Sequence, residues 1–81
     1  MTKKNVFIRK RFKEQEKALL LLMQKDPIFL ELCEDYELCL EATDYWSGKE
    51  EPGAREKANE FQSIATDLEI EISMKLAGFK A

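Results

Sequence analysis

Histidine is absent from this chain of 81 residues. The usual general base near neutral pH and the commonest metal ligand are therefore both missing. Ser–His and Cys–His nucleophile pairs are excluded, as is the Glu-x-x-His pair that helical di-iron proteins require. The two cysteines, Cys33 and Cys39, do not have the spacing of a zinc site. The sequence therefore predicts a protein that is not an enzyme and that needs no metal and no cofactor.

Glycine and proline are scarce, with three and two residues respectively. The glycines are Gly48, Gly53 and Gly78, too far apart for a phosphate-binding loop, and the chain between them is left free to form long helices. Long apolar runs are also missing. The longest covers residues 18–23, well short of the roughly 20 residues that cross a bilayer, and no secretory signal is evident. We therefore expect a cytoplasmic protein without a membrane span.

The composition that remains is that of a globular protein, with 44% hydrophobic and 36% charged residues and a net charge of −3. A chain of this length buries only about 60% of the surface that its unfolded form exposes. It needs an economical helical core, or it must share its apolar faces with a partner.

Asp26-Pro27 is the sharpest local signal, because Asp is a favoured helix N-cap and Pro suits the first helical position. We expect one helix over residues 12–25 and a second over 27–46. At 100° per residue, one broad side of the second helix is apolar. That side holds Phe29, Leu32, Cys33, Tyr36, Cys39, Leu40, Thr43 and Trp46. The other side is acidic and is expected to be solvated; it holds Glu31, Glu34, Glu37, Glu41 and Asp44.

Residues 47–53 have the composition of a turn, and a third helix is expected over residues 54–77, stopping at Gly78. Its apolar residues follow heptad spacing, at Ala54, Ala58, Phe61, Ala65, Leu68 and Ile72. That spacing is typical of the seam of an antiparallel coiled coil or helical hairpin. The sequence predicts an all-α fold, with one domain over residues 12–81 formed as a three-helix bundle or as a dimeric helical bundle.

Residues 1–11 form a basic arm whose order the sequence leaves open. It carries Lys3, Lys4, Arg9, Lys10 and Arg11. One interpretation is internal, with the arm lying across the acidic helix in weak, salt-sensitive pairing. The other is contact with nucleic acid, in which these side chains neutralise phosphates.

Several apolar residues lie outside the predicted core stripes, which is a surplus for so short a chain. They are Leu20, Leu21, Leu30, Leu38, Tyr45, Ile70 and Met74. The leading hypothesis is a non-enzymatic protein-interaction or assembly module that uses these residues to self-associate, as a dimer for example, or to bind a protein partner. A nucleic-acid-associated accessory protein is the alternative.

The segment DPIFLELCEDYELC, residues 26–39, resembles small uncharacterised bacterial helical proteins with a DPxFxxLCxDYxxC pattern. In that family a Trp, a turn and a further helix follow, and the resemblance extends over about residues 26–77. The plan also resembles, more distantly, the YdcH-like helical hairpins. Both resemblances imply a bacterial cytoplasmic hairpin with no catalytic residue or cofactor.

Overall fold

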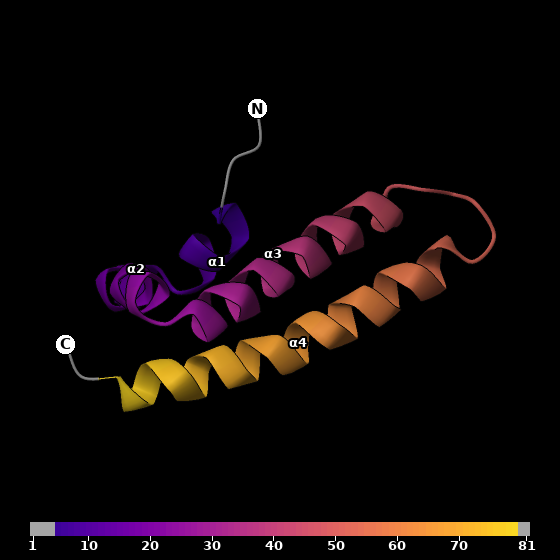
Figure 1. The fold of residues 1–81 in the computed structure, drawn as a ribbon. Coiled ribbons are helices and arrows are strands. Elements are labelled where there is room, and N and C mark those ends of the chain that lie inside the picture. The colour runs from indigo at the N-terminus through magenta and orange to yellow at the C-terminus, as the bar shows by residue number, and fades with distance from the viewer. Residues whose placement is uncertain (1–4, 80–81) are drawn as a thin grey trace.

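The computed structural model describes residues 5–79, and these residues are helical with short connections (Figure 1). The elements are α1 (Val6–Arg11), the 3-10 turn η1 (Lys13–Gln15), α2 (Glu16–Lys25), α3 (Pro27–Ser47) and α4 (Ala54–Gly78). Helices α3 and α4 form a long antiparallel hairpin, and the shorter N-terminal helices pack against it (Figure 1). The predicted all-α fold and its hairpin are confirmed.

The junction between α2 and α3 is set by Asp26 and Pro27. Asp26 has extended backbone, and its Oδ1 accepts hydrogen bonds from the N–H groups of Ile28 at 3.0 Å and Phe29 at 3.2 Å. These bonds satisfy two donors of the first turn that have no partner within the helix. The predicted boundary at this dipeptide is therefore confirmed.

Large side chains fill the seam at the end of the hairpin away from the turn, and small ones line it nearer the turn. Phe29, Cys33 and Tyr36 are buried on α3, and the Tyr36–Glu69 hydrogen bond places Leu76 and Ile72 of α4 level with the first two. Nearer the turn the buried α4 residues are Ala54, Ala58 and Ala65, whose small side chains allow the two helix axes to approach closely. Phe61, Leu68 and Trp46, which were also predicted in the seam, are half-buried.

Both ends of α4 agree with the sequence to within one residue. Gly53 precedes the helix with φ of 86°, a left-handed conformation that favours glycine, and it supports the chain reversal predicted over residues 47–53. Gly78 is the last helical residue rather than the residue after the helix, and Phe79 leaves it in extended backbone.

The N-terminal region differs from the predicted arm. Residues 6–11 form α1, and the expected helix over residues 12–25 begins as the turn η1 and becomes α-helical only at Glu16. Ile8 is fully buried and Phe12 nearly so, which places both in the same core cluster as Phe29 and Ile72. Two apolar side chains four residues apart, one of them in the segment predicted as the arm, are therefore buried against the hairpin.

The molecule is elongated, measuring 46 × 27 × 22 Å along its principal axes. Helices α1 and α2 gather near the end of the hairpin opposite the turn (Figure 1). Toward the turn, the described chain consists of two helices only. That half has fewer neighbours with which to bury apolar side chains.

Candidate functional site

The predicted interaction residues of the hairpin are mostly exposed. Leu38 and Tyr45 lie on the outer side of α3, seven residues apart, and Ile70 and Met74 lie on α4 facing away from the seam. Met74 is 69% exposed, the largest value among these four. Because the two pairs lie on opposite edges of the hairpin, they do not form one continuous surface.

The predicted interaction residues nearer the N-terminus are less exposed to solvent. Leu21 is marginally exposed, whereas Leu20 and Leu30 are half-buried and pack against the core. Leu30 lies on the side of α3 that α1 and α2 cover, which the spacing within α3 alone does not reveal. Their assignment as protein-interaction residues stays a prediction, and in this fold each is only partly accessible to a partner.

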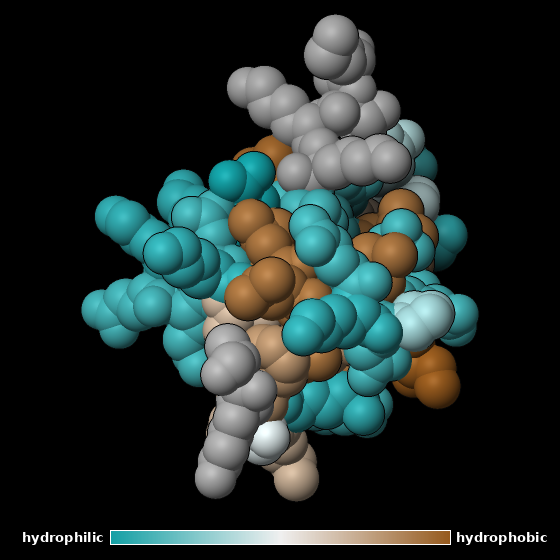
Figure 2. All heavy atoms as spheres, turned by 60° about the vertical axis from the view of Figure 1, so that its left-hand side comes forward, coloured by the Kyte–Doolittle hydropathy of each residue, from teal (hydrophilic) through white to brown (hydrophobic). Residues whose placement is uncertain are grey.

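On the hairpin, two further large apolar residues are exposed that the sequence did not single out. Ile28 is 73% exposed on α3, and Ile64 is 48% exposed on α4. The signal was present, since neither residue belongs to the predicted core stripe of its helix. Figure 2 shows that apolar side chains also break the mainly hydrophilic surface at the end of the molecule formed by α2 and the C-terminal part of α4.

Aromatic and cationic side chains gather beside the turn. The rings of Tyr45 and Trp46 meet edge to face, with centroids 5.1 Å apart. The Lys49 ammonium lies 4.7 Å from the Tyr45 ring, and that of Lys57 lies 4.4 Å from the Trp46 ring. Such contacts are attractive through the ring quadrupole. Lys57 thereby links α4 to the end of α3.

Two of the basic residues assigned to nucleic-acid contact form ion pairs with carboxylates of this chain. Arg9 pairs with Glu16 at 2.6 Å, and Arg11 pairs with Glu69 at 2.6 Å. Lys10 is exposed, and Lys3 and Lys4 lie outside the described residues. The N-terminal segment does lie on α3, but buried apolar contacts hold it there more than pairing of its cations with the acidic face.

Glu37 is the acidic residue that departs furthest from the prediction of a solvated face. It is only 6% exposed, and its two carboxylate oxygens accept hydrogen bonds from the N–H groups of Phe7 at 3.0 Å and Ile8 at 3.1 Å. Asn5, which precedes α1, makes no side-chain cap. Glu37 therefore caps α1 from another helix and lies where the positive end of the helix dipole favours an anion.

A second polar group joins three helices. Glu69 of α4 accepts hydrogen bonds from the Tyr36 hydroxyl at 3.0 Å and from Arg11 Nε at 2.8 Å. Burial, followed by the bond to Glu69, raises the pKa of the Tyr36 hydroxyl above its usual value. The hydrogen bond and charge of Glu69 also raise the pKa of Arg11. Both groups therefore keep their protons at neutral pH. The cluster holds the three helices together and is not suited to relaying protons.

The thiols are also poorly suited to chemistry. Burial, with a smaller effect from Glu34, raises the pKa of Cys33 to about 12, and burial raises that of Cys39 as well. The thiolate is the reactive form, so these cysteines are weak nucleophiles at neutral pH.

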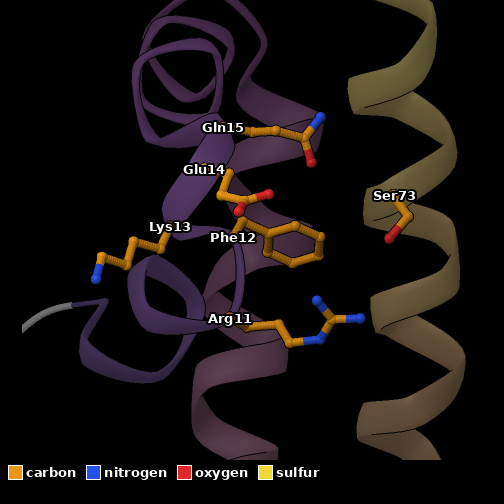
Figure 3. A pocket seen from close by; sticks show the side chains of 6 residues that line it. All are labelled: Arg11, Phe12, Lys13, Glu14, Gln15 and Ser73. Carbon is orange, nitrogen blue, oxygen red and sulfur yellow. The ribbon is translucent and has the colours of Figure 1, made fainter.

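An open cleft of about 370 Å³ lies between η1 and α4. Its lining comprises Arg11, Phe12, Lys13, Glu14, Gln15 and Ser73 (Figure 3). The Arg11 side chain extends toward α4, whereas Lys13 points away from it (Figure 3). Since Arg11 is already paired with Glu69, this cleft has little unpaired charge with which to hold an anion.

Residues 5–79 contain no group of three or more His, Cys, Asp or Glu side chains placed to hold a metal ion. Within the same part of the chain, every helix is too short or too polar to cross a membrane. Comparison with family models, curated proteins and solved structures gives no match for this chain. The resemblances described for residues 26–77 therefore stay predictions.

Proposed function

We propose that this protein is a non-enzymatic helical interaction module that works by binding protein, either a second copy or a different chain. One observation carries the proposal: the hairpin has large apolar side chains exposed along both helices, including Leu38, Tyr45, Ile70 and Met74. Single exposed apolar residues are ordinary on protein surfaces. Rows of them along a helix are typical of a contact surface.

Two features of the described residues favour binding over catalysis. The polar side chains that are buried, Glu37 and Tyr36, are engaged in hydrogen bonds that join the helices. The cysteines have raised pKa values. A reactive site normally needs a group that is activated and accessible, and these groups are neither.

The experiment combines two measurements on the full chain. Sedimentation equilibrium at micromolar concentration reports self-association, and quantitative mass spectrometry of the native protein purified from its own cells reports a stoichiometric partner. Leu38→Glu and Met74→Glu should weaken any association that uses the outer rows. Glu34→Gln, an exposed change on α3, is the matched control and should leave association unchanged. A clean monomer without a stoichiometric protein partner would contradict the proposal.

The nucleic-acid alternative keeps its prediction of steep salt dependence. Deleting residues 1–11 is a poor test, because it also removes the buried Ile8. Charge reversal at the exposed Lys10 is the better variant.

A further inference from the structure

The hairpin has two broad faces, and the described chain covers only one of them. Glu37 marks the covered side of α3, since its carboxylate binds the start of α1. Glu69 marks the covered side of α4 through its pair with Arg11. No element within residues 5–79 lies over the opposite side, which we call the open face.

The open face is mainly apolar along α3, with the exposed Asp35 as the one charged residue in its arc. At 100° per residue, Leu32, Cys39 and Ile28 lie about 140–180° around the helix axis from Glu37. Ile28 is the most exposed of the large apolar residues, and Leu32 and Cys39 are half-buried at the edge of the core.

Helix α4 contributes a second heptad stripe, which adjoins its seam with α3 and shares Phe61 and Leu68 with the predicted seam. Its members are Lys57, Phe61, Ile64, Leu68, Glu71 and Lys75, spaced 4-3-4-3-4. The centre of the stripe is apolar and its two ends are lysines. Ile64 is exposed, and Phe61 and Leu68 are half-buried. This is the pattern of a helix with contacts on two sides, as in a four-helix bundle.

We infer that the open face binds the open face of a second copy, so that two hairpins form a four-helix core with α1 and α2 on the outside. The inference rests on the proposed interaction function and names the occupant of one surface. The area is suitable. The 21 residues of α3 span about 30 Å, and two adjacent helices are about 20 Å wide, giving a corrugated face close to the roughly 800 Å² per partner of a stable interface.

Charge selects the arrangement of the two copies. Helix α3 carries six acidic side chains and no basic one, so placing α3 against α3 would bring like charges together. A two-fold axis parallel to the helices instead places α3 of each copy opposite α4 of the other. The Tyr36–Glu69 hydrogen bond fixes the register within a hairpin. Lys75 of the second copy is then level with residue 30 and lies beside Glu31.

The test is sedimentation equilibrium of the full chain from about 1 to 100 µM, with far-UV circular dichroism to confirm the fold of each variant. Wild type should form dimers. Ile64→Glu should raise the dissociation constant by more than about tenfold, because a charge would be buried without a partner. The matched control, Ser63→Glu, places the same charge one residue away, at an exposed position on the outer side of α4, and should leave the dimer intact.

A charge exchange tests the arrangement. Lys75→Glu should weaken the dimer, and adding Glu31→Lys should restore it. Failure of that rescue would overturn the placement of α3 opposite α4. A dimer that survives Ile64→Glu but is lost in Ile70→Glu would overturn the open face while leaving the proposed interaction function in place. A wild-type monomer over the whole range would overturn the inference, and the proposed function would then depend on a different protein partner.

Discussion

The Glu37 carboxylate satisfies backbone donors of a helix that lies 30 residues away in sequence. Hydrogen bonds to a charged acceptor are stronger than those between neutral groups, and this site is almost closed to water. Removing the carboxylate leaves the N–H groups of Phe7 and Ile8 without a partner. The start of α1 therefore depends on one side chain of α3.

We expect Glu37→Ala to lower the free energy of unfolding by about 1–3 kcal/mol, with a smaller loss for Glu37→Gln, whose amide oxygen still accepts a hydrogen bond. Urea denaturation followed by circular dichroism measures the change. Glu41→Ala, an exposed change one turn along α3, is the control and should stay within about 0.5 kcal/mol of wild type. Equal losses in the two variants would argue that Glu37 is not a cap.

The Cys33 thiol makes the folding stability depend on pH in the alkaline range. Burial raises the pKa of this thiol to about 12 in the folded protein, well above the pKa near 8.5 of an ordinary thiol in the unfolded chain. The folded state therefore holds this proton longer than the unfolded state does. The resulting stabilisation is complete below about pH 8.5 and is lost as the pH rises toward 12.

The expected slope is up to about 1.4 kcal/mol per pH unit, measured by urea denaturation at pH 8, 9 and 10. Cys33→Ala should be less stable throughout because of its cavity, but its stability should decline less steeply in this range. Above about pH 10 the raised pKa of Tyr36 adds a loss of the same sign in both proteins. Parallel curves from pH 8 to 10 would show that the thiol proton is not linked to folding.

At the scale of elements, α1 belongs to the core rather than to a detachable arm. Ile8→Ala should lower the free energy of unfolding by about 2–5 kcal/mol, because it empties a fully buried site beneath the helix. Val6→Ala, on the exposed side of the same helix, should cost less than about 0.5 kcal/mol. Thermal or urea denaturation of both variants provides the comparison. A similarly small loss of unfolding free energy for Ile8→Ala would show that α1 does not contribute to the core.

Helices α1 and α3 differ in whether their first residues can be predicted from the sequence. The start of α3 was predicted because Asp26 and Pro27 act on their own helix. The start of α1 was not, because its cap comes from Glu37 and Asn5 offers no side-chain cap. The four-residue spacing of Ile8 and Phe12 was the available signal. The segment was not assigned as a helix because its four apolar residues, Val6, Phe7, Ile8 and Phe12, do not share one helical face.

The candidate surface shows the same difference between local and long-range contacts. The exposure of Leu38, Tyr45, Ile70 and Met74 follows from their angle to the seam, which the sequence alone supplies. The burial of Leu30 depends on which face of the hairpin α1 and α2 cover. That choice is made by contacts between distant segments. Helical periodicity therefore predicted the hairpin surface but not the side that is left uncovered.

At the scale of the whole molecule, opposite charges are segregated along the chain. Residues 6–25 hold six basic and two acidic side chains, whereas α3 holds only acidic ones. The surface pair between Arg9 and Glu16 is half-exposed, and pairs of this kind contribute less than about 1 kcal/mol each. Charge therefore sets how segments and copies are oriented, and apolar burial supplies most of the stability.

An association through the open face would make stability depend on concentration. If the folded chain pairs and the unfolded chain does not, mass action stabilises the folded state as protein is added. Well above the dissociation constant, each tenfold increase in chain concentration should add roughly 1.4 kcal/mol to the apparent free energy of unfolding per dimer. Urea midpoints measured at 1, 10 and 100 µM should therefore rise for wild type and for the control Ser63→Glu. They should coincide for Ile64→Glu, since a monomer unfolds independently of its concentration. Midpoints that do not move in wild type would mean that the hairpin is stable alone, with the open face left uncovered in the folded protein.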